Sequence, residues 1–593
     1  MKKNIFKAIS LLICFNLLLG GCSGGGETGK KDDDLKKLDA FQTITDAETP
    51  SWEQDKSEFT FEWFLNVPWM IWPTNGHDMV SAKIKELTGA TIKIRVASTE
   101  DNTELSTMIS SGQFPDVISV QASYTQTSQL ADQGYIWSID DLMDRFAPSM
   151  KPRFLEQQKD VHDWFMRGDG KLYGLPNISY PNMYKEGLDI APNGGFLVRE
   201  DWYNEVVAQG IDMTSPDGLI AGCKYIAGKY KNAIPIQLDQ FTQNGNHSLI
   251  WLAQYFAVPF ETRNGEYNYT LTDPKYAECI QFINRCTREK LIDTTNFSAN
   301  RDAITRNIAS KNVFVSMVTP QDYLNPLISC YNSGVTYIPI VLRNSAGDDP
   351  VLQDLSGKGY LLSMITKQAE RPDKIIKVFD FLTSEEGQLL TQYGVEGETW
   401  NWEDESKTRI KWTDSYLEKY NNDDIGSFGL KYCNMLINQA FVEKVAPRGT
   451  AGKKDSDIYV NNLKKPLCPY SYDYSPSFLI HDTSDSEYFS YLQKNDIITK
   501  LWARYLPDIL RANSEEEAMK KYQETIQEMK NRGLDDVIAF NARSYQTAKK
   551  AAGVTVGWPP YREDYQSPTA KDGSKIGPNG DFSYWEDAEH TNK

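Results

Sequence analysis

The sequence has 593 residues, with 63 Lys and Arg against 81 Asp and Glu, which gives a formal net charge of -18. A chain of this length exceeds what one hydrophobic core usually supports, so we expect more than one domain. The acidic balance excludes nucleic-acid binding and docking on anionic lipid as main functions, because both require clustered cations.

A secretory signal is predicted at the N-terminus. A basic start with three lysines precedes an apolar stretch over residues 8–19, which is too short to span a bilayer as a helix. The stretch ends in Leu-Gly-Gly-Cys at residues 19–22, which resembles the lipobox of bacterial lipoproteins. We therefore expect residues 1–21 to be removed and Cys22 to carry the lipid, with an ordinary secreted protein and a chance cysteine as the alternative.

Residues 22–56 are expected to form a flexible tether. They are rich in Gly, Lys, Asp, Glu and Thr and contain few large apolar side chains, too few to offset the entropy of ordering. No segment after the tether is long and apolar enough to predict a transmembrane helix. The globular body is thus expected to be held near a membrane through the lipid alone.

The body opens with an alternation of strands and helices. Apolar runs at residues 59–67, 91–96 and 116–120 read as strands, and residues 78–88 and 105–110 between them have helical spacing. This alternation predicts a parallel sheet flanked by helices. Ligands of such open sheets lie at the carboxyl ends of the strands, so this rule places the loop at residues 66–73 and the loop after residue 120 at the expected cleft.

Short motifs then follow one another over residues 57–550. They are residues 111–117 (SGQFPDV), 134–142 (GYIWSIDDL), 169–176 (DGKLYGLP), 196–202 (FLVREDW), 384–387 (SEEG), 394–400 (GVEGETW) and 529–536 (MKNRGLDD). No single motif is decisive, but their order resembles extracellular solute-binding protein family 1, the capture subunits of carbohydrate ABC importers, in its large lipoprotein branch.

The resemblance implies an α/β, two-lobed fold of the periplasmic-binding-protein type (type II), with discontinuous lobes, a hinge and a helical C-terminal extension. Hinge closure around a ligand is taken here from the resemblance. The expected divisions are the signal 1–21, the tether 22–56, the first lobe 57–180, the second lobe 181–357, a return to the first lobe 358–395, and the remainder of the second lobe with the extension 396–593.

The resemblance also implies a function. We expect a monomeric, lipid-anchored protein outside the cytoplasm that captures an oligosaccharide and delivers it to the permease subunits of an ABC importer, without a cofactor. Two alternatives stay open. A surface glycan receptor uncoupled from import has the same sequence features, and a glycan-active enzyme needs only two carboxylates across a cleft.

Exposed aromatic rings are the expected sugar-binding side chains, because sugars present flat C–H faces to stack on. Trp69 and Trp72 lie in the proline-flanked loop after the first strand. Trp400 follows Gly397 in a loop that faces the solute in relatives, with Glu396 beside it. Together these residues form the main candidate site.

Further candidates have equally good structural interpretations. Trp251 and Tyr255 lie four residues apart on an apolar helix, where core packing is the more common role. Arg199 and Asp201 match the family, but this pair can equally be a helix cap and an ion pair. Tyr323 follows an apolar strand at residues 313–318 and completes the predicted ligand-binding set.

No metal site and no catalytic site are predicted. The five histidines show no metal-binding spacing, and neither GxSxG nor a P-loop occurs. Many large relatives carry a calcium loop after the Asp-Trp motif, but the corresponding residues 224–235 contain no acidic side chain. The cysteines after Cys22 form no CxxC pair and are interpreted as buried apolar residues.

Overall fold

The computed structural model describes residues 35–552 apart from short internal stretches. The stretches that it does not describe are 69–76, 100–101, 123–124, 180–191, 193, 243–244, 263, 354–357, 423, 425, 431–434, 448–455, 457–458, 461–462, 464, 473, 475–476, 478, 480 and 482–484. Cys22, Trp69 and Trp72 therefore lie outside the described residues. Within the described part of the chain, no helix has the length and apolar character needed to cross a membrane.

The first sheet has the strand order β2-β1-β3-β13-β4. Its strands are β1 (Phe59–Leu65), β2 (Ala90–Val96), β3 (Val117–Gln121), β4 (Leu175–Pro176) and β13 (Leu361–Ile365). β1 pairs in parallel with β2 and β3, which confirms the predicted alternation, whereas β13 runs antiparallel to β3 and β4. The strand that returns late in the chain thus lies inside the first sheet.

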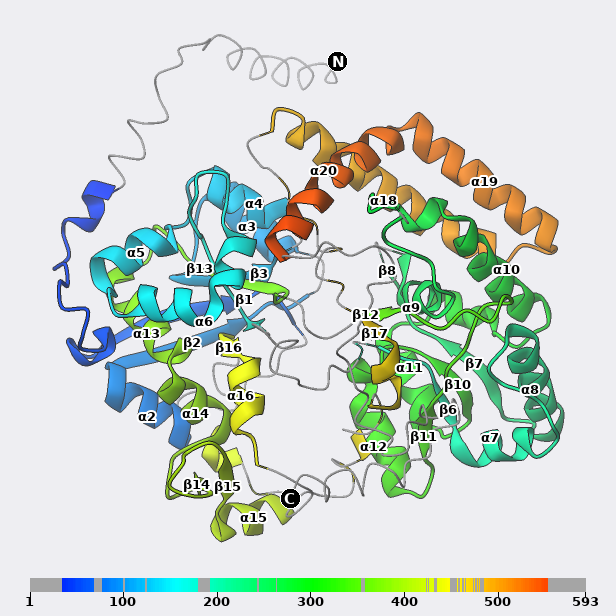
Figure 1. The fold of residues 1–593 in the computed structure, drawn as a ribbon, viewed down its shortest axis with the longest axis horizontal. Helices are drawn as coiled ribbons and strands as arrows, with labels where there is room; N and C mark the ends of the chain where they lie inside the picture. The colour runs from blue at the N-terminus through cyan, green and yellow to red at the C-terminus, as the bar shows by residue number, and fades with distance from the viewer. Residues whose placement is uncertain are drawn as a thin grey trace, which may run out of the picture.

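Helices pack on both sides of this sheet (Figure 1). They are α2 (Met79–Thr88), α3 (Thr103–Ser111), α4 (Thr125–Asp132), α5 (Ile139–Phe146), α6 (Met150–Phe165), α13 (Pro372–Thr383) and α14 (Glu385–Tyr393). Their core includes Trp63 of β1, which is fully buried. α13 and α14 follow each other directly, and the Ser384 hydroxyl accepts a hydrogen bond from the Gly387 N–H and caps α14.

The second sheet has the order β11-β6-β10-β7. Its strands are β6 (Leu197–Arg199), β7 (Ile234–Leu238), β10 (Val313–Met317) and β11 (Tyr337–Pro339). β7 and β10 are parallel, and β6 runs antiparallel to β10 and β11. The surrounding helices are α7 (Glu200–Val207), α8 (Pro216–Lys229), α9 (His247–Tyr255), α10 (Pro274–Arg288), α11 (Arg301–Ala309) and α12 (Leu324–Asn332).

The two sheets lie in separate halves of the molecule, as Figure 1 shows, and define two lobes. The chain passes from the first lobe to the second between β4 and β6 and returns between β11 and β13. Both lobes are thus discontinuous in sequence, as the resemblance implies. The expected boundaries at residues 181 and 358 fall within these two passages.

The N-terminal segment differs from the expected tether. Residues 35–56 pack on the first lobe, where Leu38 is fully buried and Trp52 is 5 % exposed. The Ser51 N–H and Arg153 both donate hydrogen bonds to the buried Asp380 carboxylate. A few well-placed apolar side chains therefore order a segment that is polar overall, and any tether ends before residue 35.

Residues 396–445 also differ from expectation, because they pack on the first lobe rather than continue the second. They form β14 (Trp400–Trp402), β15 (Ile410–Trp412), α15 (Asp414–Asn421), β16 (Ile437–Asn438) and α16 (Gln439–Val445). β16 pairs with β5 (Ile178–Ser179), and the Gln388 amide of α14 donates to the Leu436 carbonyl. A strand of two residues, which no sequence pattern signals, thus fixes the position of the whole segment.

The C-terminal extension is helical, as expected. It comprises α18 (Tyr488–Leu510), α19 (Glu515–Asn531) and α20 (Leu534–Ala552), which pack on the core of the second lobe. The Ser514 hydroxyl caps α19 by accepting a hydrogen bond from the Glu517 N–H. The extension also reaches the first lobe, since α20 packs on α6 and the Tyr488 hydroxyl donates to Ser128 of α4.

Short elements complete the described chain. They are β8 (Phe241–Thr242), β9 (Gly245–Asn246), β12 (Leu352–Gln353), β17 (Ser471–Tyr472) and the 3-10 helices η1 (Ser51–Glu53), η2 (Thr270–Thr272), η3 (Thr294–Ser298), η4 (Pro320–Tyr323), η5 (Gly426–Phe428) and η6 (Lys465–Tyr470). β12 and β17 form a parallel pair between distant parts of the chain.

Candidate functional site

A buried carboxylate marks the edge of the second lobe where the parallel strands β7 and β10 end. Asp239 follows β7 directly and is 2 % exposed. Its oxygens accept hydrogen bonds from the Tyr323 hydroxyl at 2.9 Å, the Gln240 N–H at 2.8 Å and the Thr319 N–H at 3.3 Å. These donors satisfy the charge, which would otherwise be costly to bury.

Trp251 and Tyr323 from the predicted set meet at this edge. The Trp251 indole N–H donates to the Thr319 hydroxyl at 2.9 Å, and Tyr323 is bonded to Asp239. Both side chains are buried, with 5 % and 2 % exposure. Their rings therefore have little free area for stacking on a sugar, and they support the polar groups of the edge instead.

The corresponding edge of the first lobe carries amides and one exposed ring. Asn66 follows β1, and its amide donates to the Asn102 side-chain oxygen. Tyr360 precedes β13, where its N–H donates to the Asn177 side chain and its carbonyl accepts from the Ala122 N–H. The Tyr360 side chain is 44 % exposed. The edge of the first lobe formed by the end of β1 and the start of β13 thus presents planar hydrogen-bonding groups.

One carboxylate of the second lobe lies close enough to Tyr360 of the first lobe to affect its pKa. Burial raises the pKa of Tyr360, and the Asp322 carboxylate of the second lobe raises that pKa further. Asp322 belongs to η4, directly beside Tyr323. An exposed aromatic ring of one lobe therefore lies within the electrostatic reach of the acidic edge of the other.

A family model for bacterial extracellular solute-binding proteins matches residues 80–391. The chain belongs to this family. The match spans both lobes up to the end of α14.

Solved structures of substrate-binding proteins share the fold. One is FusA of S. pneumoniae, an ABC-transporter substrate-binding protein solved with kestose, at 16 % identity and a TM-score of 0.62, covering 83 % of this chain and 100 % of that chain. Another is an oligosaccharide (HMO) binding, ABC-transporter-associated protein of Bifidobacterium longum infantis, at 15 % identity and a TM-score of 0.62, covering 83 % and 99 %. The alginate-binding protein AlgQ2 matches at 17 % identity and a TM-score of 0.55, covering 83 % and 99 %. No curated protein sequence matches the chain.

In this solute-binding protein, Arg199 and Asp201 lie at the edge of the second sheet that is opposite to the edge with Asp239. Because β6 runs antiparallel to β10, its carboxyl end lies beside the start of β10, and the Arg199 guanidinium donates to the Lys311 carbonyl there. Arg199 also forms a bidentate pair with Asp201 at 2.7 Å and lies 4.0 Å from the Trp202 ring centre. The structure supports the ion-pair interpretation of this motif, whereas no side chain caps α7 at Arg199 and Asp201 lies in the first turn of the helix.

Trp400 and Glu396 lie in a separate part of the first lobe. Trp400 is 3 % exposed, its indole N–H donates to the Gly394 carbonyl at 2.9 Å, and its ring packs edge-on against Trp402. Glu396 is exposed. Trp400 is thus a core residue of the hairpin formed by β14 and β15, and the structure gives its ring no exposed face.

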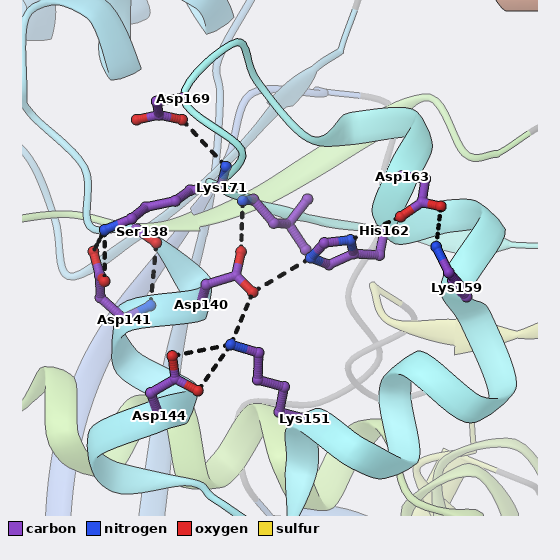
Figure 2. A network of polar contacts seen from close by, with 11 residues as sticks. Ser138, Asp140, Asp141, Asp144, Lys151, Lys159, His162, Asp163, Asp169 and Lys171 are labelled. Atoms are coloured by element: carbon purple, nitrogen blue, oxygen red, sulfur yellow. Dashed lines mark hydrogen bonds and ion pairs between the residues drawn. The ribbon is translucent and has the colours of Figure 1, made fainter. Parts of the chain in front are cut away.

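A second polar network, drawn in Figure 2, joins α5, α6 and the turn at residues 167–171. His162 lies between Asp140 and Asp163, with each ring nitrogen 3.3 Å from a carboxylate oxygen. The hydrogen bond to the Asp140 carboxylate is the main cause that raises the pKa of His162, against the effect of burial. Asp140 also accepts from the Leu172 N–H, so this network fastens the turn to the two helices.

One group of side chains missed by the sequence analysis has metal-binding donors. Within the described residues, donor atoms of Asp239, His247 and Asp322 all lie within 4.8 Å of one another. Asp239 is buried, and the other two are exposed. Asp239, His247 and Asp322 do not form a short sequence motif. The sequence signal for this group is therefore the position of Asp239 directly after a strand.

The four cysteines whose side chains the structure describes behave as predicted. Cys223, Cys279, Cys286 and Cys330 are free and buried. Burial raises the pKa of each thiol, which keeps it protonated and unreactive.

Proposed function

We propose that the protein captures an oligosaccharide between its two lobes and presents it to the permease of an ABC importer. The observation that carries this proposal is the set of polar groups at the strand ends of the two lobes, with Asp239, Thr319 and Asp322 in the second lobe and Asn177 and Tyr360 in the first. Carboxylates, amides and an exposed ring suit a ligand with many hydroxyl groups and apolar faces.

The family and the fold support the same function. Family members are extracytoplasmic solute-binding proteins, and FusA and the Bifidobacterium protein, which bind oligosaccharides according to their descriptions, share the two-lobed architecture. The proposed ligand set therefore keeps Tyr323 and Trp251 as supports and adds Asp322 and Tyr360. Trp69 and Trp72, in the loop after β1, are proposed to stack on the sugar.

We further propose that Cys22 carries a lipid and that residues 23–34 hold the body at the membrane. This tether is shorter than residues 22–56, because the first lobe begins to pack at about residue 35. A polar, glycine-containing chain of twelve residues has a root-mean-square reach of roughly 20 Å, which would keep the first lobe close to a membrane partner.

The test is a thermal-shift and calorimetric screen of neutral oligosaccharides, uronic oligosaccharides and peptides, followed by product analysis of every hit. A ligand that binds only the native state raises the unfolding midpoint. We expect glycan binding without cleavage and a loss of affinity in Tyr360→Ala. Cleavage of the bound glycan, or binding of peptides alone, would contradict the proposal.

A further inference from the structure

Helix α9 receives the chain at the end of its first passage between the lobes. A Cβ added at Gly194 would lie 2.6 Å from Cζ2 of the Trp251 indole, so the backbone at this position rests directly on the ring. Two residues later, the Phe196 N–H donates to the Tyr255 hydroxyl at 2.9 Å, and the two rings stack with their centres 4.5 Å apart. Trp251 and Tyr255 lie four residues apart on α9, and both are buried. The end of the first passage is thus fixed on one face of this helix.

The return passage to the first lobe is fixed on the same helix. The Gln254 carbonyl accepts a hydrogen bond from the Val351 N–H at 2.9 Å, and the Gln254 side chain accepts one from the Gln353 N–H at 2.7 Å. The chain comes back to the second lobe after residue 445, and there the Tyr474 hydroxyl donates to the Val351 carbonyl and β17 pairs with β12. Figure 1 shows β12 and β17 beside α9. The chain therefore meets α9, directly or through β12, each time it passes between the lobes.

The same helix holds the ends of the two parallel strands β7 and β10, where the polar edge of the second lobe lies. The Asp239 N–H donates to the Ser248 hydroxyl at 2.8 Å, and this hydroxyl donates to the Met317 carbonyl at 2.6 Å. The Trp251 N–H donates to the Thr319 hydroxyl, and the Thr319 N–H donates to the Asp239 carboxylate. α9 thus connects the passages between the lobes with the groups of the polar edge.

Trp251 belongs to both sets of contacts. The face of its indole supports Gly194, and its N–H is bonded to Thr319 at 2.9 Å. Glycine allows this close approach of backbone and ring, because it has no Cβ. Trp251 is 5 % exposed, and a ring in a close-packed interior moves only together with its neighbours. A change in the course of the first passage therefore acts on Thr319 through Trp251.

We propose that Trp251 is a positioning residue, which couples the first passage between the lobes to the polar edge of the ligand site. A rotation of the lobes displaces the backbone at Gly194, moves the Trp251 ring and reorients the Thr319 hydroxyl. The inference rests on the proposed function and deepens it, because the hydrogen-bonding groups that a ligand meets then depend on the angle between the lobes. Trp251 acts through Thr319 and does not stack on the sugar.

Hydrogen–deuterium exchange with mass spectrometry on the full, ligand-free chain tests this coupling. Gly194→Ala places a Cβ against the indole. We expect exchange to become about fivefold faster at residues 317–323 as well as at residues 194–196, the effect of losing one hydrogen bond. Gly228→Ala on α8 is the matched control, because a Cβ there meets nothing within 4 Å. This control should leave the exchange of residues 317–323 unchanged.

Substitutions at Thr319 separate the coupling from the packing of the ring, and they decide the question if Gly194→Ala does not fold. Thr319→Val removes the hydroxyl that accepts from Trp251, and Trp251→Phe removes the N–H that donates to it. Both should accelerate exchange at residues 317–323 to a similar extent, and the double variant should exceed neither. Thr319→Ser keeps the acceptor and should exchange like the unmodified protein.

Two results would overturn the inference. Unchanged exchange at residues 317–323 in Gly194→Ala or in both Trp251→Phe and Thr319→Val would show that the ring supports the passage without acting on the edge. Acceleration of equal size in β1 and β3 of the first lobe would show a general loss of stability instead. No glycan enters this experiment, so the coupling can fail while glycan binding is found. A screen without a glycan hit would remove the proposed function and leave the measured coupling in place.

Discussion

Replacing Tyr323 by Phe removes one donor from the buried Asp239 carboxylate and keeps the ring that fills the core. Asp239 is 2 % exposed, so water cannot easily replace the lost hydroxyl. Hydrogen bonds to charged groups contribute about 1.5–3 kcal/mol. Because the Gln240 and Thr319 N–H groups still donate to Asp239, we expect a loss near the lower limit, about 1.5–2 kcal/mol.

Equilibrium urea unfolding followed by tryptophan fluorescence measures this change. The control is Tyr505→Phe, a half-buried tyrosine on α18 of the same lobe, which should change stability by less than about 0.5 kcal/mol. A double-mutant cycle of Tyr323→Phe with Asp239→Asn should give a coupling energy of about 1 kcal/mol or more. Additive effects, or a loss in Tyr323→Phe no larger than in the control, would refute the argument that this hydroxyl stabilises the carboxylate.

Three further predictions follow from single contacts. Trp52→Ala should destabilise the protein by about 3–5 kcal/mol in urea unfolding, since Trp52 is a core residue. If residues 35–56 were a flexible tether instead, the substitution would not change the stability. His162→Gln should reduce the free energy of unfolding most under acidic conditions. Asp140 and Asp163 hold the pKa of His162 above its unfolded value. The stabilisation by the protonated ring is therefore fully present below about pH 6.5 and is lost as the pH rises through the folded pKa. An equal cost in unfolding experiments at acidic and alkaline pH would contradict this sign. Tyr360→Ala should weaken glycan binding about tenfold in calorimetry and leave the unfolding midpoint nearly unchanged, because Tyr360 is 44 % exposed and belongs to none of the buried core clusters. A lowered midpoint with full affinity would indicate a structural role.

The sequence predicts those elements whose signals are local. The first three strands with α2 and α3 follow from apolar periodicity, and α14 and α19 follow from their serine caps. The position of residues 396–445 was not predictable, because it depends on the pairing of β16 with β5 across more than 250 residues.

The candidate site was predicted in part, and for a similar reason. Ligands of open sheets lie at the carboxyl ends of parallel strands, and this rule indicates Asn66. The same rule applies to Asp239, which was not predicted because the expected sugar-binding side chains were aromatic. Trp400 was misleading because a glycine-rich loop suggests exposure, whereas the fold closes Gly394 over its indole. Tyr360 has one sequence signal, an aromatic residue between Gly359 and a returning strand.

The C-terminal extension adds a further mechanical link between the lobes. The chain crosses between them three times, because residues 396–445 pack on the first lobe before the extension packs on the second. In addition, α18 and α20 contact α4 and α6 from the side of the second lobe. A relative rotation of the lobes must therefore break the hydrogen bond between Tyr488 and Ser128 or carry α20 across the surface of α6. The extension thus sets the range of angles through which the lobes can open, and the energetic cost of opening is distributed over a surface far from the ligand.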